Sequence, residues 1–470
     1  MTLRSTVFAS VTFLALLAGF AGNAWQATSD WLHVRNQYDT EALVIGRMAR
    51  SAQRFRFSEG GLLGFAEKGA PQVTSDTVAL WTARDFGYQT EAYAHGAPIR
   101  SFSPYFSHAG LQGAGFAALD AVLPLPPSQR KLDLFRGINA ALVAAGYTLV
   151  VFWLRRELGL GAALACLACL LVSPWLAAFS PNLYWSLWLF LLPPIAIGAT
   201  LAAQGARPRN RWLAGAAFVA FFVRFLAGYE FITAAAAMTL APVAYRAVRD
   251  RWSARETFRA FAVIVGAAAA ALVLSLGVLL LQISAATGSK RAALRQVEFA
   301  IARRTGGAAE RLPSAYAPGL RAKTSDVVGS YLSDRADRGA GSRRPAALRW
   351  LNAWTYGEAI ALIFLAMLGI VVRARIRPAP NLLRARALAA AVVTCLAGIL
   401  AWLVLFKAHS YYHLHVNPLM WHLLFLPLGA SLVFTAAADT AGLVGRAISR
   451  QPLPARPGGP ASKPNSPGLR

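Results

Sequence analysis

The stretch RAFAVIVGAAAAALVLSLGVLLLQI, residues 259–283, decides the fold class because it has the composition of a membrane span. After Arg259 it carries no charged residue, and it exceeds the roughly 20 residues that cross about 30 Å of hydrocarbon. An arginine-rich segment, 246–259, leads into it, and a long polar segment, 284–350, follows it. The stretch therefore predicts a transmembrane helix with arginines at one end and a large loop at the other.

Apolar runs of similar length recur along the chain. The ten predicted spans are 6–25, 135–154, 158–178, 184–203, 212–227, 230–247, 259–283, 351–372, 386–406 and 419–438. The mean hydropathy of +0.44, with 56% hydrophobic and 14% charged residues, is too apolar for an ordinary soluble domain. We therefore predict an all-α polytopic membrane protein with about ten transmembrane helices and the lipid bilayer as its surroundings.

The charges predict an orientation in the membrane. A soluble chain with a net charge of +26 would suggest nucleic-acid binding, but here short loops hold many of the arginines. The arginine-bearing short loops are 155–157, 204–211, 246–259 and 373–385. They all fall on one side, and cytoplasmic loops carry such an excess. We expect the inner membrane of a bacterial cell, both termini in the cytoplasm and no nucleic-acid partner.

The spans divide the chain into segments. These are a first helix (1–25), a first external loop (26–134), helices two to seven (135–283), a second external loop (284–350), helices eight to ten (351–438) and a disordered cytoplasmic tail (439–470). The first helix also resembles a signal peptide cleaved after Ala24. In the basic second loop we expect a helix near 290–304 and a mobile stretch, GAGSRRP, at 339–345.

The first external loop opens with candidate catalytic carboxylates. We predict a helix from Asp39 to Gln53, with Asp39 as its N-cap and an apolar stripe lying along the membrane surface. Asp39 and Glu41 would face a cavity at membrane level, although Asp39 as a mere cap is the alternative. Further along, Arg100, Tyr105 and His108 lie in an aromatic-rich stretch that suits a sugar or lipid headgroup, or equally a small folded domain.

Ionisable residues within the predicted spans are costly and usually face a polar cavity or a partner. Arg224 and Glu230 flank a turn in FFVRFLAGYEF, and Glu358 lies in TYGEAIALIF. In the functional interpretation, Arg224 holds a lipid phosphate while Tyr229 and Glu230 shape the pocket. In the structural interpretation, Arg224 and Glu230 pair with each other and Glu358 pairs elsewhere.

The densest polar stretch is KAHSYYHLHVNP, residues 407–418, between the last two spans. All seven histidines fall on the predicted outer side. Lys407 and His409 are candidate phosphate contacts, and Tyr411, Tyr412 and His413 are candidate pocket walls. The sequence assigns no cofactor. A divalent metal on His409 and His413 is the alternative, without an obvious third ligand, and an interfacial aromatic belt is another.

This arrangement resembles the GT-C superfamily of membrane glycosyltransferases. The resemblance lies in the number of spans, the large first external loop with an acidic residue soon after helix one, and a second large external region late in the chain. It implies a polyprenyl-phosphate-linked sugar donor, a glycan, lipid or protein acceptor, and an early-loop carboxylate that acts as base or positions the acceptor. By position Asp39 in YDTE matches that carboxylate, with Glu41 as a nearby substitute.

Three other functions are alternatives to the glycosyltransferase. A transporter or flippase of lipid-linked saccharides needs the cations and aromatic rings but no base. A polysaccharide polymerase or ligase also takes a polyprenyl-linked donor. A structural membrane subunit leaves the histidine cluster unexplained.

Overall fold

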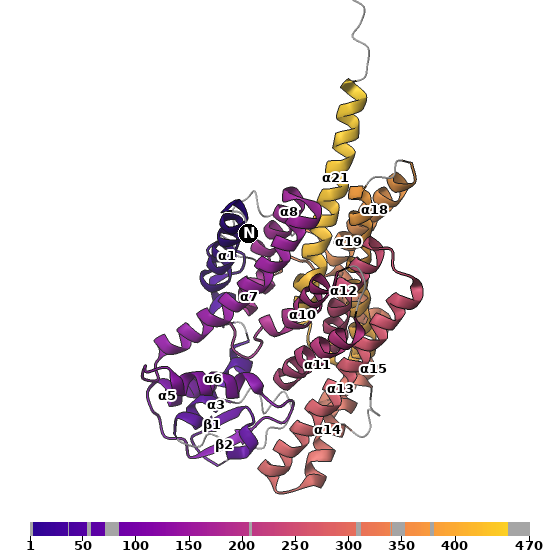
Figure 1. The fold of residues 1–470 in the computed structure, drawn as a ribbon. Coiled ribbons are helices and arrows are strands. Elements are labelled where there is room, and N and C mark those ends of the chain that lie inside the picture. The colour runs from indigo at the N-terminus through magenta and orange to yellow at the C-terminus, as the bar shows by residue number, and fades with distance from the viewer. Residues whose placement is uncertain are drawn as a thin grey trace, which may run out of the picture.

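The computed structural model describes residues 3–35, 37–53, 58–70, 84–205, 209–306, 312–338, 340, 353–376 and 380–449 (Figure 1). In this part of the chain, seven helices are long and apolar enough to cross a membrane. They are α1 (Leu3–Gly22), α7 (Gln129–Leu158), α11 (Asn210–Ala227), α13 (Ala254–Thr287), α18 (Tyr356–Ile376), α19 (Pro380–Leu405) and a π-helical turn, η5 (Trp421–Phe425), continued by α21 (Leu426–Ser449). The chain is an all-α membrane protein with several membrane-crossing helices, as predicted.

The three remaining predicted spans are helical but differ in length or polarity. Segment 158–178 is split into α8 (Leu160–Leu171) and α9 (Pro174–Phe179), because the Ser173 hydroxyl accepts a hydrogen bond from Leu176 N and starts a new helix. Segment 184–203 becomes α10 (Trp188–Gln204), and 230–247 becomes α12 (Ile232–Arg249), which ends in two arginines. The total of ten spans therefore stays a prediction.

The predicted first external loop folds into a small domain, and the helix predicted along the membrane surface lies at its centre. A short helix, α2 (Asp30–Arg35), leads into it, and α3 (Tyr38–Ala52) forms its centre. Around α3 pack η1 (Ser58–Gly61), β1 (Gly64–Glu67), α5 (Gly87–Ala94), β2 (Ser101–Pro104) and α6 (Leu111–Val122). We call residues 37–122, in the parts that the structure describes, the first-loop domain.

The interior of this domain corrects two predictions about α3. The helix begins at Tyr38 after a left-handed Gln37, so Asp39 lies in the first turn and does not cap it. Residues 41–49 are all buried, including Arg47, which donates to Leu62 O and pairs with Glu59. A surface helix would expose one face. Gly46 permits the close packing, since a Cβ there would lie 2.3 Å from Gly64 O.

The predicted second external loop is largely helical in the part that the structure describes. After α13 come α14 (Lys290–Thr305), η3 (Ser314–Tyr316), α15 (Ala317–Arg321) and α16 (Thr324–Ser333). The predicted helix near 290–304 is therefore confirmed. The last loop forms α20 (Lys407–Tyr412), which packs against α14, α15 and α16. Of the predicted mobile stretch 339–345 only Ala340 lies within the described residues.

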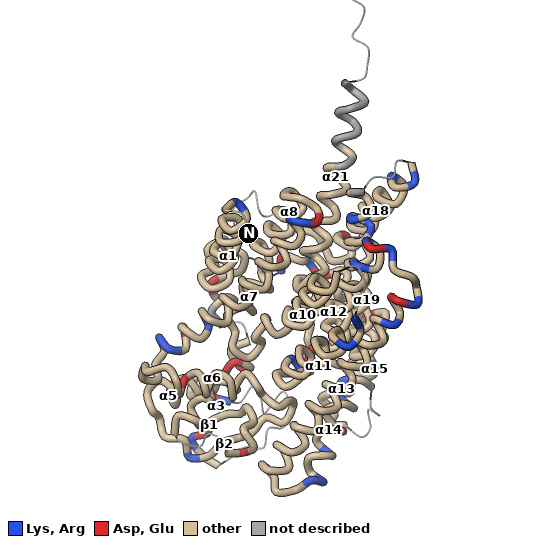
Figure 2. Tube along the Cα trace, in the orientation of Figure 1, with Lys and Arg blue, Asp and Glu red and all other residues tan. Residues whose placement is uncertain are grey.

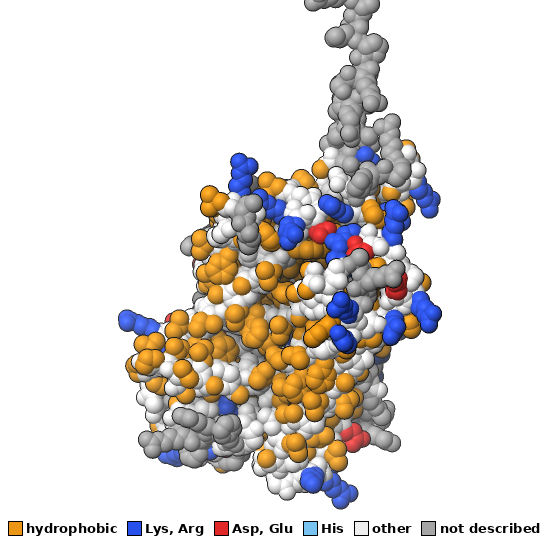
Figure 3. Space-filling view, viewed as in Figure 1, with side chains coloured by type: hydrophobic (Ala, Val, Ile, Leu, Met, Phe, Trp, Pro, Cys, Tyr) orange, Lys and Arg blue, Asp and Glu red, His pale blue; other side chains and the backbone are white. Residues whose placement is uncertain are grey.

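The molecule has two distinct ends. The start of α1 and the C-terminal end of α21 lie at one end, and the first-loop domain and α14 lie at the other (Figure 1). Lys and Arg lie mostly on loops and helix ends (Figure 2), and hydrophobic side chains cover much of the face between the ends (Figure 3). We call the end with the first-loop domain the outer end. Helix α21 continues to Ser449, so the predicted tail from 439 begins as helix, and 450–470 lie outside the described residues.

Candidate functional site

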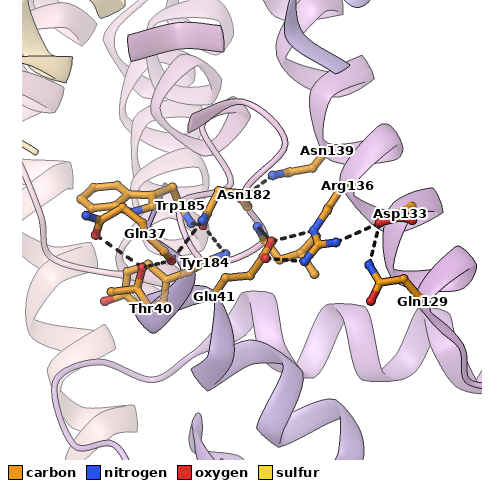
Figure 4. Close-up of polar contacts among 11 residues, drawn as sticks. Gln37, Thr40, Glu41, Gln129, Asp133, Arg136, Asn139, Asn182, Tyr184 and Trp185 are labelled. Carbon is orange, nitrogen blue, oxygen red and sulfur yellow. Dashed lines mark hydrogen bonds and ion pairs between the residues drawn. The ribbon is translucent and has the colours of Figure 1, made fainter. Parts of the chain in front are cut away.

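The loop 180–187, between α9 and α10, joins the first-loop domain to the membrane helices. The Asn182 side-chain oxygen accepts from Tyr184 N and Trp185 N, and Asn139 of α7 donates to Asn182 O over 2.7 Å (Figure 4). Glu41 of α3 accepts from Leu183 N over 3.1 Å. Because both neighbouring elements hold this loop, the side chain of Tyr184 has a fixed position.

Glu41 itself is held in a buried ion pair. Its carboxylate is 4% exposed and accepts from Arg136 Nη2 over 2.6 Å and from Arg136 Nε over 3.3 Å (Figure 4). Arg136 also pairs with Asp133. A two-pronged arginine contact and a backbone N–H occupy both carboxylate oxygens, so Glu41 fastens α3 to α7 and to the 180–187 loop.

Tyr184 is the centre of a polar cluster between the first-loop domain and the turn that joins α11 to α12. Its hydroxyl lies 3.0 Å from His108 Nε2 and donates to Glu230 Oε1 over 3.5 Å. The ring of Tyr105 meets His108 edge-on at 5.7 Å. Burial lowers the pKa of His108 to about 4 against the opposing charge of Glu230, so His108 is neutral at pH 7.

Arg224 shapes the turn that presents Glu230. Its guanidinium donates to Gly228 O over 2.7 Å and to Glu230 O over 2.9 Å, and it stacks on the Phe190 ring at 3.7 Å. A Cβ on Gly228 would lie 2.3 Å from Glu230 Oε2, so the glycine makes room for the carboxylate. The half-buried Tyr229 lies between them in sequence. Arg224 thus holds the backbone of this turn and contacts no carboxylate directly within the described residues.

Two arginines of α14 enter the same cluster from the second external loop. Arg303 and Arg304 each donate to Ser107 Oγ over 3.3 Å, which places them beside His108. The charge of Arg304 acts on His108 and Glu230, and also on His409 and His413 of the last loop. Arg304 therefore lies between the two halves of the predicted site.

The histidines of the last loop stack on one another. His409 and His413 face each other with ring centroids 4.1 Å apart, as the predicted helical spacing requires, and His415 follows at 5.6 Å. Burial lowers the pKa of His413 to about 3 and that of His409 well below its usual value. Burial also lowers the pKa of His415, while the nearby carboxylate of Asp39 opposes this shift. The charge of Asp39 thus acts on the last loop.

Neutral imidazoles can ligate a metal ion, but a site needs more ligands than this stack supplies. Within the described residues, no group of three or more His, Cys, Asp or Glu side chains is arranged to hold a metal ion. His409 and His413 instead offer nitrogen atoms that accept or donate hydrogen bonds at neutral pH. A ring of Trp402 closes this side of the stack, 5.7 Å from His409.

Other predicted residues serve the fold. Lys407 donates to Ala322 O, and the Tyr412 hydroxyl bonds Ala315 O and Gly319 N, so both tie α20 to α15 and its neighbours. Tyr411 is 43% exposed. Arg100 is exposed before β2, with its backbone N–H on Glu67 O.

Glu358 lies at the start of α18, not at membrane depth as predicted. Its carboxylate accepts from the backbone and hydroxyl of Thr355, and the Thr355 hydroxyl accepts from Glu358 N. This reciprocal pattern is a capping box, and the sequence T-x-x-E at 355–358 carries its signature. Glu358 therefore starts a helix and takes no part in the cluster.

The outer site therefore consists of Asp39, Tyr105, His108, Tyr184, Arg224, Glu230, Arg303, Arg304, His409, His413 and His415. Sequence reasoning missed Tyr184, Arg303 and Arg304 as site residues. The pair RR at 303–304 ends a helix, where basic residues ordinarily serve the helix dipole, so nothing local marks it. No protein family matches the chain, and neither does a curated protein or a solved structure.

Proposed function

We propose that the protein is an integral membrane glycosyltransferase that takes a sugar from a polyprenyl-phosphate-linked donor at the outer end. The position of Arg304 carries this proposal. Its charge reaches both the Tyr184–Glu230 cluster and the stacked histidines, so residues from four separate segments converge on one region. Such convergence supports recognition of an anionic headgroup by clustered guanidinium groups.

The reaction assigns each part of the outer site a role. Asp39 accepts the proton of the acceptor hydroxyl while the hydroxyl oxygen forms a bond to the anomeric carbon of the sugar. The bond between that carbon and the oxygen of the lipid phosphate breaks at the same time. The guanidinium groups of Arg303 and Arg304 stabilise the charge that grows on the leaving phosphate. The rings of Tyr105 and Tyr184 flank the sugar. Asp39 suits the base better than Glu41, whose carboxylate is committed to Arg136 and Leu183 N.

The arginine-bearing short loops support a placement in the bacterial cytoplasmic membrane. The segments 155–157 and 373–376 belong to the end of the molecule where α1 begins and α21 ends. By the positive-inside rule that end faces the cytoplasm, and the outer site faces the opposite side. The acceptor, whether a glycan, a lipid or a protein, then meets the donor outside the cytoplasm.

The test is transfer of a labelled sugar from a polyprenyl-phosphate donor by the purified full chain in lipid vesicles. Asp39→Asn should lower the transfer rate by about 10²-fold or more, since a general base contributes about 10²–10⁴-fold. Asp326→Asn, at an exposed carboxylate of α16, is the matched control and should keep full activity. Full activity in Asp39→Asn removes the proposed base.

A second assay separates the enzyme from its main rival. The same vesicles are supplied with a fluorescent lipid-linked saccharide, and its movement between leaflets is measured. Wild-type protein that moves this lipid across the bilayer but transfers no sugar from any polyprenyl-linked donor would be a transporter, and the glycosyltransferase proposal would be wrong.

A further inference from the structure

A cavity separate from the outer site lies toward the end of the molecule where α1 begins. It has a volume of about 520 Å³ and lies between α7, α10 and α12, with its floor on Leu424 and Leu428. This size falls within the range of small-molecule and lipid sites, about 300–1,000 Å³. It shares no lining residue with the outer site, and the proposed glycosyl transfer does not use it.

The walls of this inner cavity are apolar and open to the side. Leu191, Pro194 and Ile195 of α10 face Leu149 and Val150 of α7 across it. Leu149 is 55% exposed, and Ala199 on the opposite wall is also exposed. Because Leu149 lies on α7, one of the seven helices long and apolar enough to cross a membrane, the opening beside it faces lipid, and the cavity can be reached from within the bilayer.

The mouth of the cavity is polar and basic. Arg249 pairs with Glu157 over 2.9 Å and with Asp250 over 2.7 Å, and Tyr245 donates to Glu157 over 2.7 Å. Arg246 also pairs with Asp250. These bonds form a fixed polar rim in which Arg249 and Arg246 are neutralised.

Arg156 lies at the same rim but, unlike Arg246 and Arg249, has no carboxylate partner within the described residues. It is exposed, and it makes no ion pair or hydrogen bond with any residue that the structure describes. An apolar slot beneath a single available guanidinium matches an amphiphile with a long apolar chain and an anionic head. Basic pockets between membrane helices bind the headgroups of anionic lipids in this way.

We infer that the inner cavity binds one acyl chain of an anionic phospholipid, whose phosphate rests on Arg156. The polar rim lies toward the end of the molecule where α1 begins and α21 ends, and the opening faces the bilayer. The lipid therefore comes from the leaflet on that side. This site is separate from the donor site proposed at the outer end, and it does not depend on the proposed function.

The test measures lipids retained by the full chain from nanodiscs of phosphatidylglycerol and phosphatidylcholine in equal amounts, by native mass spectrometry. Wild-type protein should retain phosphatidylglycerol preferentially. Arg156→Gln should lower that retention about fivefold, the effect of one basic residue at an anionic surface. Arg255→Gln removes an equally exposed arginine from the start of α13, outside the cavity, and should change nothing.

Filling the cavity tests the acyl chain. A Cβ on Gly198 meets no heavy atom within 4 Å, so Gly198→Leu occupies the slot without a clash at the backbone. It should abolish retention of both phospholipids at this site. Gly266→Leu on α13 makes the same change where there is also open space, and it is the control. Ala199→Leu serves if Gly198→Leu lowers the thermal unfolding midpoint.

Three results would overturn the inference. Equal losses in Arg156→Gln and Arg255→Gln would mean that the effect is diffuse electrostatics. Undiminished retention in both filled variants would place the lipid elsewhere. Polyprenyl phosphate that displaces phosphatidylglycerol when added at the same concentration would assign the cavity to that carrier lipid instead.

Discussion

Two glutamates on either side of the 180–187 loop, the buried Glu41 and the half-buried Glu230, show how the same side chain can serve the fold or the site. Glu41 accepts bonds from Arg136 and Leu183 N at both oxygens. Glu230 accepts from Tyr184 at 3.5 Å, interacts with its own backbone N–H and has no ion pair within the described residues, although Arg224 and Arg304 act on its charge. Glu230 is partly exposed and makes fewer bonds than Glu41, so its carboxylate is the one with capacity left for a ligand.

The two glutamates are also connected. Glu41 holds Leu183, and the next residue, Tyr184, carries the hydroxyl that reaches Glu230. The ion pair of the first-loop domain thereby positions the outer site. The comparison predicts that changes at Glu41 act first on stability, whereas changes around Glu230 act first on activity.

The largest expected effect is loss of stability on breaking the Glu41 ion pair. Glu41→Ala leaves Arg136 without its buried partner and should lower the free energy of unfolding by about 3–5 kcal/mol. The thermal unfolding midpoint of the purified protein measures it. The double variant Glu41→Gln with Arg136→Gln should recover part of the loss. An unchanged unfolding midpoint in Glu41→Ala would show that Glu41 does not stabilise the fold and would remove its difference from Glu230.

The next effect is on transfer, at the α14 arginine between the two halves of the site. Arg304→Gln should lower the rate of sugar transfer by about 10²–10³-fold, the usual cost of removing one stabilising donor. The unfolding midpoint should change little. Arg295→Gln, on an exposed position of the same helix, should transfer at the wild-type rate. Equal rates in the two variants would take α14 out of the site.

A smaller effect concerns acid. His108 and His413 have pKa values of about 4 and about 3 in the folded protein, below the ordinary 6.5. Below pH 6.5 the unfolded chain therefore takes up protons that the folded chain does not. The free energy of unfolding should be steady above pH 6.5 and fall below it, by at most about 1.4 kcal/mol per pH unit for each histidine.

This dependence is measured as the unfolding midpoint between pH 7.5 and 4.5. Combined His108→Gln and His413→Gln should flatten the profile relative to wild type. His95→Gln, at an exposed position, should leave the slope unchanged. A slope as steep as that of the wild type after the double substitution would show that these two histidines do not contribute, because only the part due to His409 and His415 should remain.

The smallest expected effect is at the link between the glutamates. Tyr184→Phe keeps the ring but removes the hydroxyl beside His108 and Glu230, and one such hydrogen bond contributes about 1 kcal/mol. Transfer should fall about fivefold, and the free energy of unfolding should fall by no more than about 1 kcal/mol. Tyr411→Phe, at an exposed ring, is the control. A loss of stability without loss of transfer would place Tyr184 with Glu41 as a structural residue.

Sequence reasoning succeeded where one segment determines its own structure. The apolar runs became helices, the 290–304 helix formed, and His409 and His413 faced each other at helical spacing. It failed where distant segments meet. Ser107 and Arg304 lie 197 residues apart, and no local pattern marks either one. Glu358 was a different failure, since the capping-box pattern at 355–358 was present in the sequence.

The surface helix predicted from Asp39 failed for a similar reason. An apolar stripe along α3 is visible in the sequence, but the partners that cover its other faces, β1, α5 and α6, come from later in the loop. Their packing buries even Arg47. Amphipathic spacing alone does not separate a helix that rests on lipid from one at the centre of a small domain.

The length of α13 has a consequence for how the outer site meets the membrane. Its 34 residues span about 51 Å, about 20 Å more than the hydrocarbon layer, so one end of the helix stands clear of the lipid. Near that end, Gln282 donates a hydrogen bond to Ala109 O of the first-loop domain over 3.1 Å. The helix then leads directly into α14. Helix α13 and its bond to the first-loop domain thus set the distance of Arg303 and Arg304 from the membrane surface. If the bilayer becomes thinner or thicker, the residues of the outer site should move together relative to that surface.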